Sequence, residues 1–137
     1  KRVGLGMNEY ELSQNPQLDE YFVQDLNQNP TFPFSDDSFD AITCVVSVDY
    51  LIDPLKIFAE MARVLRPKGR AIISISNRCF PSKAFRLWLR TNDLEHIFIV
   101  GAFFHYSNMF FPAKAFDISP NPGKSDPLYV IEATVKK

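Results

Sequence analysis

Polar side chains stand at several places where an apolar run stops, and these are the residues with which this chain could do chemistry. They lie at Met7–Glu9, Asp25–Asn27, Ser47–Tyr50 and Ser76–Arg78. Carboxylates, amides and hydroxyls are hydrogen-bonding groups that can hold and orient a polar ligand. In an open parallel sheet, ligands bind outside the carboxyl ends of the strands, so the four places would share one edge. Strand ends are also polar in many proteins that bind nothing there, and both interpretations stay open.

The elements that would position these side chains can be read from the apolar pattern. Short apolar runs over Val3–Met7 and Tyr21–Val23 predict two strands. Asn8, a capping residue followed by carboxylates, predicts a short helix between them. The segment Leu26–Ser38 is rich in Asn, Pro and Asp, which is typical of a loop.

The middle of the chain predicts a strand and a helix in succession. Ala41–Val48 is rich in β-branched residues without strict alternation, which is typical of a strand buried on both faces. Asp53 and Pro54 then supply an N-cap and a first-turn proline for a helix that ends near Arg66.

The remainder continues the alternation of strands and helices. Ala71–Ile75 predicts a buried strand, followed by helices over Ser82–Arg90 and Leu94–Phe104. Two final strands, near Phe116 and over Tyr129–Val135, enclose a turn-rich connection. The order of elements therefore predicts a βαβ series with a hairpin-like end.

The composition is that of one ordinary domain. The chain has 137 residues, of which 46% are hydrophobic, and a net charge of −1. That charge gives no overall field that would attract nucleic acid. Cys44 and Cys79 accompany apolar runs as small hydrophobes do, so neither a disulfide framework nor a metal site is expected. With no membrane-length apolar run and no visible leader, we expect an intracellular protein, cytoplasmic by default, or organellar if a leader has been lost.

The stretch Phe32–Asn77, FPFSDDSFDAITCVVSVDYLIDPLKIFAEMARVLRPKGRAIISISN, resembles the middle of class I S-adenosylmethionine-dependent methyltransferases of type 11. An acidic loop, the triplet SFD, an apolar strand, a proline-led helix and RVLRP follow in the family's order. Lys68 stands where the family more often has glycine. The resemblance implies a single α/β domain over 1–137. Its fold would be a Rossmann-like, mostly parallel sheet with helices on both faces and an antiparallel C-terminal strand.

The resemblance also implies S-adenosylmethionine as the cofactor. Asp25 matches the family's acidic residue that accepts a hydrogen bond from the adenine amino group, and Leu26 would lie beside the adenine ring. A carboxylate suits an exocyclic amine because it only accepts hydrogen bonds when ionised. A strand-end carboxylate in a turn is the alternative for Asp25.

The segment after the central strand matches the family's segment that faces cofactor and substrate. Ser47 and Val48 are the residues expected on the cofactor side. Asp49 and Tyr50 are candidates to orient the methyl acceptor or to take its proton, although a solvated acid and a half-buried aromatic fit the same positions. No catalytic base is assigned.

Two features of the family are missing from this chain. The family's ribose-binding acidic residue aligns with Gly6, and Asn8 or Glu9 could substitute for it. The Gly-rich loop after the family's first strand has no counterpart. Because that strand lies between the second and fourth in the family, the resemblance predicts an N-terminally truncated sheet whose two strands lack their shared neighbour, in a chain that was longer.

The expected function is methyl transfer to an unidentified acceptor, more plausibly a small molecule than a macromolecule. Such a transfer is an in-line displacement that needs alignment more than acid–base catalysis. A degenerate, non-catalytic module for interaction or folding is the alternative, favoured by Gly6 and the missing loop. A nicotinamide-binding domain is disfavoured because no G-x-G-x-x-G occurs. An open strand edge would also favour a homodimer or aggregation.

Other polar residues have simpler explanations. His96 and His105 are too far apart in sequence for a metal pair on one helix and suit core or surface positions. Lys83, Arg86 and Arg90 form a basic stripe, which is usually a solvated face and less often a site for an acidic substrate.

Overall fold

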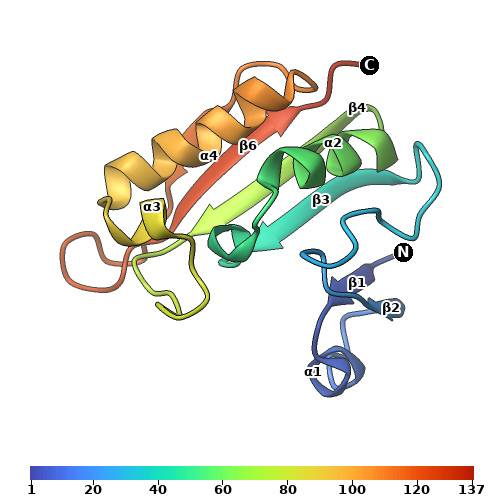
Figure 1. Ribbon diagram of the computed structural model, residues 1–137, viewed down its shortest axis with the longest axis horizontal. Coiled ribbons are helices and arrows are strands. Elements are labelled where there is room, and N and C mark those ends of the chain that lie inside the picture. The colour runs from blue at the N-terminus through green and yellow to red at the C-terminus, as the bar shows by residue number, and fades with distance from the viewer.

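The computed structural model describes residues 1–137 and contains two β-sheets (Figure 1). The first sheet has two strands, β1 and β2, and the second has four strands in the order β3-β4-β6-β5. The strands are β1 (Val3–Gly6), β2 (Glu20–Val23), β3 (Phe39–Val45), β4 (Leu65–Ile75), β5 (Lys114–Asp117) and β6 (Tyr129–Thr134).

β6 is the strand that runs against both of its neighbours. β1 pairs with β2 in parallel, and β3 pairs with β4 in parallel. β6 is antiparallel to both β4 and β5, so β5 has the direction of β4. In Figure 1 the arrow of β1 points the same way as that of β3. The mixed α/β fold with an antiparallel C-terminal strand is therefore confirmed.

Three helices begin at side-chain caps, and two of these caps, Asn8 and Asp53, are the predicted ones. Asn8 accepts a hydrogen bond from the Glu11 N–H, and Asp53 accepts one from the Lys56 N–H. Asn92 and Glu95 form a capping box. The helices are α1 (Glu9–Ser13), the 3₁₀ turn η1 (Val48–Tyr50), α2 (Pro54–Val64), α3 (Arg86–Leu89) and α4 (Asp93–Ser107). None of them is both long and apolar enough to cross a membrane.

The core lies between the four-stranded sheet and the two long helices. Figure 1 shows α2 and α4 on the same face of this sheet. Phe58 of α2 is fully buried and makes edge-to-face contacts with Phe104 of α4 and with Phe110. Alternate residues of β4, among them Ile73 and Ile75, are buried beneath the helices. Aromatic and branched side chains therefore fill one side of the sheet.

β3 is half-buried rather than buried on both faces. Ile42 and Cys44 pack against the core, whereas Ala41, Thr43 and Val45 are exposed. The prediction of burial on both faces is wrong because α2 and α4 cover only one side of this sheet.

β3 ends at Val45, three residues before the predicted end at Val48, which lies in η1. Two predicted starts differ by four residues or more. The helix expected over Ser82–Arg90 is reduced to α3, because the Phe85 N–H donates to the carbonyl of Asp49 instead of to a helical partner. β4 begins at Leu65, directly after α2, because Leu65 pairs with Phe39 before a register shift in the ladder. The strand is therefore longer than the predicted Ala71–Ile75.

The two sheets do not pair with each other. β1 has only β2 as a neighbour, and β3 has only β4. The predicted loss of a shared neighbour between these strands is thus present in the structure. The consequence is a cavity between β1 and β3, described below.

Candidate functional site

The predicted cofactor segment and the predicted acceptor segment are joined by one side chain. The amide nitrogen of Asn27 donates to the Tyr50 carbonyl at 2.9 Å, and its Oδ1 accepts from the Ile52 N–H at 3.0 Å. Asn27 follows Asp25 and Leu26 in the loop after β2, while Tyr50 belongs to η1 after β3. Residues far apart in sequence therefore meet at the carboxyl ends of the strands.

Asp25 is half-buried and held in a tight turn. Its Oδ1 accepts from the Asn27 N–H at 2.9 Å, and its carbonyl accepts from Gln28 and Asn29. The Oδ2 atom has no hydrogen-bond partner within the chain and can accept a hydrogen bond from a ligand. Leu26 is half-buried against the core. An acceptor beside an apolar surface suits an amino-substituted aromatic ring.

Asn8 and Glu9 lie at the carboxyl end of β1, beside the Asp25 loop. The Gln24 N–H donates to the Gly6 carbonyl at 2.9 Å, which fixes the end of β1 against the start of that loop. Asn8 uses its Oδ1 as the N-cap of α1, which leaves its amide nitrogen as a donor. Glu9 is exposed in the first turn of α1.

The residues at the end of β3 differ in which of their groups a ligand could contact. Ser47 is half-buried, and its Oγ lies 3.3 Å from the Sγ of Cys44. Val48 is fully buried, so its side chain belongs to the core and only its backbone could face a ligand. Burial raises the pKa of the Cys44 thiol, which disfavours a reactive thiolate there.

Asp49 is the most unusual polar residue of the molecule. Its side chain is buried, and Oδ2 has no hydrogen-bond partner. Burial raises the pKa of the Asp49 carboxyl, an effect that its own backbone N–H and His96 only partly oppose. A carboxyl in this state can give or take a proton closer to neutral pH than an ordinary aspartate.

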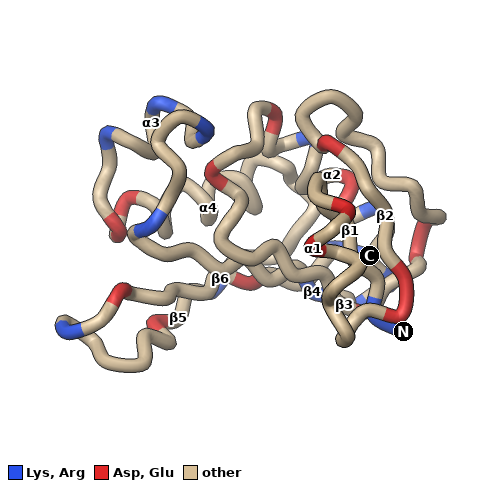
Figure 2. Tube along the Cα trace, turned by 90° about the horizontal axis from the view of Figure 1, so that it is seen from below, with Lys and Arg blue, Asp and Glu red and all other residues tan.

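The segment that follows β4 covers η1. The Phe80 N–H donates to the Tyr50 hydroxyl at 3.0 Å, and the Phe85 N–H donates to the Asp49 carbonyl at 3.0 Å. Figure 2 shows Lys and Arg residues gathered around α3. Lys83, which belongs to the covering segment, is exposed. Sequence patterns missed this cover because its contacts are made between segments far apart in the chain.

His96 is a core histidine. Its ring stacks on Trp88 with the centroids 3.8 Å apart, and its Nε2 donates to the Trp88 carbonyl at 2.8 Å. Nδ1 is buried without a partner. His105, the second histidine, is exposed at the other end of α4.

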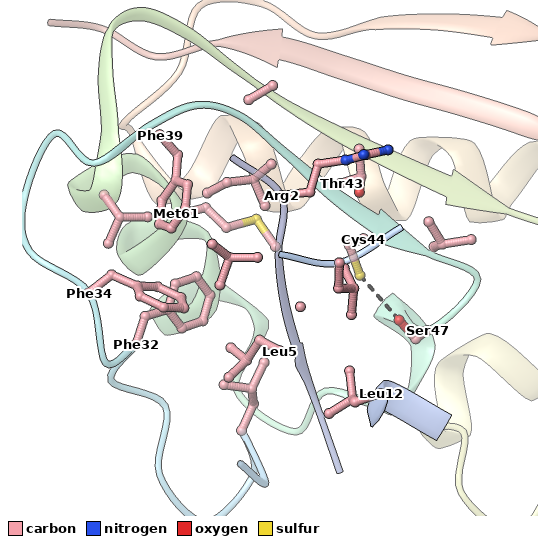
Figure 3. A pocket seen from close by; sticks show the side chains of 18 of the residues that line it. Arg2, Leu5, Leu12, Phe32, Phe34, Phe39, Thr43, Cys44, Ser47 and Met61 are labelled. Atoms are coloured by element: carbon pink, nitrogen blue, oxygen red, sulfur yellow. Dashed lines mark hydrogen bonds between the residues drawn. The ribbon is translucent and has the colours of Figure 1, made fainter. Parts of the chain in front are cut away.

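A cavity of about 670 Å³ lies between β1 and β3 (Figure 3). Of its 23 lining residues 16 are hydrophobic, and none is Asp or Glu. Only Leu26 and Ser47 of the predicted site residues reach it. Asp25 and Leu26 fit the adenine end of S-adenosylmethionine, whereas the cavity offers no carboxylate for the cofactor's ammonium group. The candidate site is therefore the edge formed by the strand ends, and the cavity is a separate feature.

Comparison with known sequences points to one family. A family model described as a methyltransferase domain matches residues 6–73. Methyltransferase GfsG of Streptomyces halstedii is 44% identical over 50 residues, which are 36% of this chain and 18% of that protein. The demethylmenaquinone methyltransferase of Clavibacter sepedonicus is 46% identical over 41 residues, 30% of this chain and 17% of that protein. The chain thus spans less than a fifth of the length of these relatives.

Comparison with solved structures covers nearly the whole chain. A methyltransferase of Thermotoga maritima, titled SAM-dependent and a possible histamine N-methyltransferase, has a TM-score of 0.66 at 17% identity, over 99% of this chain and 73% of that one. A SAM-dependent methyltransferase of Aquifex aeolicus has a TM-score of 0.67 at 16% identity, over 98% of this chain and 68% of that one. These likenesses confirm the predicted fold, and both structures are described as SAM-dependent methyltransferases, which supports S-adenosylmethionine as the cofactor. The chain therefore has the class I S-adenosylmethionine-dependent methyltransferase fold, and its residues 6–73 are similar in sequence to the methyltransferase-domain family.

Proposed function

We propose that residues 1–137 supply the adenine side and the acceptor side of a site for S-adenosylmethionine-dependent methyl transfer. The observation that carries this proposal is the Asn27 side chain, which ties the Asp25 loop to η1 through two hydrogen bonds. These hydrogen bonds support the proposal because they join the loop of Asp25 to η1 at the edge where ligands of such sheets bind.

On the cofactor side, the residues bind and orient rather than react. Asp25 would accept a hydrogen bond from the adenine amino group through Oδ2, and Leu26 would pack against the ring. Asn8 would donate to a ribose hydroxyl, and Glu9 could accept from one. Ser47 and the backbone of Val48 would face the bound molecule from β3. The cofactor supplies an activated methyl group when it is bound.

On the acceptor side, Asp49 and Tyr50 are the groups with free hydrogen-bonding capacity. The Tyr50 hydroxyl accepts from Phe80, so its own proton is free to be donated to an acceptor atom. The raised pKa of Asp49 suits a group that takes the proton which an N–H or O–H acceptor must lose. The enclosure of η1 by residues 80–85 favours a small acceptor over a macromolecule.

Calorimetric titration with S-adenosylmethionine and S-adenosylhomocysteine tests the cofactor side. Asp25→Asn keeps the oxygen that accepts from Asn27 but replaces Oδ2 by a donor, so binding should weaken about 10-fold to 100-fold, as expected when a charged hydrogen bond is lost. Asp40→Asn is the matched control, because Asp40 lies at the opposite end of β3 and makes only an exposed ion pair with Arg66.

Two results would contradict the proposal. One is the absence of saturable heat from a chain that circular dichroism shows to be folded. The other is equal weakening in the Asp25→Asn and Asp40→Asn variants. Either result would leave the non-catalytic module, for folding or interaction, as the function to test next.

A further inference from the structure

Three basic side chains around α3 have no acidic partner. Lys83, Arg86 and Arg90 are exposed, and none of them belongs to an ion pair of the chain. Residues 61–92 contain no Asp or Glu. In Figures 1 and 2, α3 lies at the end of the molecule away from β1 and β2. A chain with a net charge of −1 therefore has a positively charged end.

Large apolar side chains lie exposed among these charges. Phe80 is 66% exposed, Leu87 56% and Leu89 47%. The Nζ atom of Lys83 lies 5.3 Å from the centroid of the Phe80 ring, so charge and apolar surface belong to one patch. Apolar groups that gather on a surface mark a place where a partner or a membrane binds. We call this patch the α3 surface; it comprises Phe80, Lys83, Arg86, Leu87, Leu89 and Arg90.

Trp88 fixes the direction in which α3 presents these groups. Its ring is buried and stacks on the ring of His96 with the centroids 3.8 Å apart. Arg86 and Arg90 stand two residues before and after Trp88, which is a rotation of about 200° in a helix. Both arginines therefore point away from the core, with the exposed leucines on either side of them.

The acidic groups nearest to this surface are already engaged or buried. Asp126 pairs with Arg78 at 2.8 Å. Glu95 accepts from the Asn92 N–H in the capping box of α4. The carboxyl group of Asp49 is buried beneath the segment that covers η1. The positive charge of the α3 surface is therefore available to an external anion.

The mixture of charge and apolar area limits what can occupy the surface. A small anion would pair with the arginines but leave Leu87 and Leu89 in water. Nucleic acid binds basic residues through its phosphates and also gives exposed leucines no apolar partner. A bilayer with anionic lipids offers both, because its phosphates lie directly above the acyl chains.

We propose that the α3 surface docks on the face of a bilayer that contains anionic lipids. Leu87 and Leu89 would enter the boundary between headgroups and acyl chains, while Arg86 and Arg90 bind lipid phosphates. The long arginine stems let the charged groups reach the phosphates beside inserted leucines. The contact is peripheral, because no helix is long and apolar enough to cross the membrane. This inference does not depend on methyl transfer.

Sedimentation with vesicles provides the first test. The probe is a vesicle of phosphatidylcholine and phosphatidylglycerol in a ratio of about 2:1, and the control is a vesicle of phosphatidylcholine alone. The 137-residue chain should bind the anionic vesicles about 10-fold more tightly or better. Raising the salt concentration from about 0.05 M to about 0.5 M should release most of the bound chain, because salt screens the attraction.

Charge variants show whether the arginines make the contact. Replacing both arginines, Arg86→Gln with Arg90→Gln, should weaken binding to anionic vesicles by about 10-fold to 30-fold. The matched control is Lys68→Gln with Lys136→Gln, which changes the net charge equally. Lys68 and Lys136 are exposed at the opposite end of β4, where the Val135 N–H donates to Gly69. The control should bind like wild type.

A leucine variant tests the apolar part of the contact. Leu87→Ala should weaken vesicle binding about 5-fold, because part of an inserted side chain is lost. Val23→Ala is the matched control, since Val23 is 51% exposed on β2, at the other end of the molecule. All four of these side chain sets are exposed, so circular dichroism should show an unchanged fold.

The fluorescence of Trp88 locates the contact without any variant. Trp88 is the only tryptophan of the chain and lies within α3, between the two exposed leucines. Bromine atoms on lipid acyl chains quench tryptophan only at short range. Anionic vesicles with brominated acyl chains should therefore quench Trp88, whereas the same vesicles without bromine should not.

Four results would overturn the inference. Neutral vesicles could bind as well as anionic ones, which would remove the role of charge. The arginine and lysine double variants could lose equal affinity, or the bound chain could show an unquenched Trp88, and either result would place the contact elsewhere. Finally, poly-L-glutamate could bind while anionic vesicles do not, which would make an acidic protein the partner of the α3 surface.

Discussion

The N-terminal unit β1–α1–β2 and the four-stranded sheet are built in different ways. No residue before Phe32 is buried, although the unit has regular strands and a capped helix. The buried hydrophobic residues of the core lie in the four-stranded sheet, its helices and the segments that connect them; Phe58, Ile73 and Ile131 are examples. Regular secondary structure is therefore present in both regions, but only one of them has a core of its own.

The difference shows that the N-terminal unit depends on the segment that follows it. Phe22 of β2 packs edge-to-face on Phe34, which packs in turn on Phe39 of β3. Asn27 adds hydrogen bonds to η1, and Arg63 of α2 binds the same connecting segment. Few buried contacts and an open strand edge are the features of a region that opens locally. We expect β1 and β2 to exchange their amide hydrogens faster than β4 and β6.

The largest expected effect is a loss of stability when a core aromatic ring is removed, and its size should differ between the two regions. Phe58→Ala should lower the free energy of unfolding by about 3–5 kcal/mol, because a fully buried aromatic ring is replaced by a cavity. Urea denaturation measured by circular dichroism gives this value. Phe22→Ala is the matched change in the N-terminal unit and should cost about 1 kcal/mol. Equal losses in both variants would show that the N-terminal unit shares one cooperative core with the sheet.

A smaller effect is expected from replacing Arg63, the α2 residue that holds the segment connecting the two regions; we call these Arg63 contacts the tether. Arg63 donates to the carbonyls of Phe32 and Phe34 and to the carboxylate of Glu60. Arg63→Met should cost about 1–2 kcal/mol near pH 7, less than fully buried charged hydrogen bonds because the group is partly solvated. Arg63→Lys, which keeps the charge but not the fork, should lie between wild type and Arg63→Met.

The pH dependence of the tether follows from Glu60. Arg63 holds the pKa of the Glu60 carboxyl below its usual range. A carboxylate with a depressed folded-state pKa stabilises the fold above its unfolded value of about 4.3, and this stability is lost as the pH falls through the folded value. The difference between wild type and Arg63→Met should therefore shrink below pH of about 4. A difference that stays constant on acidification would contradict a role for this ion pair.

How far the sequence predicted the structure depends on the range of the interactions involved. Asp53 and Pro54 marked the start of α2 because capping is a local property. The residues of the Ser47–Tyr50 segment were also found by local pattern, since an apolar run stopped there. The cover over η1 was missed, because the Phe85 N–H bonds to Asp49 across the fold. Burial on one face of β3 was missed for the same reason, since it depends on which helices lie over the sheet.

The smallest expected effect is the change in stability caused by replacing Asp49 in the well-packed region. It tests whether this residue serves function or the fold. Asp49 has a buried Oδ2 without a partner and a pKa that burial raises. Its unfolded state ionises at a lower pH than its folded state, so stability should fall as the pH rises from about 4 through the folded value. Asp49→Asn removes this dependence and should raise the free energy of unfolding at pH 8 by about 1 kcal/mol.

The outcome has meaning only when stability and transfer are measured on the same samples. A residue kept for function is expected to cost stability, so Asp49→Asn should gain stability while losing methyl transfer in any chain that shows it. The stability of both proteins is measured by thermal unfolding from pH 4.5, just above the ordinary pKa of aspartate, to pH 8.5. A variant less stable than wild type at every pH would mean that the carboxylate supports the fold. The acceptor-side role of Asp49 would then be wrong, whereas the cofactor side at Asp25 would remain open to its own test.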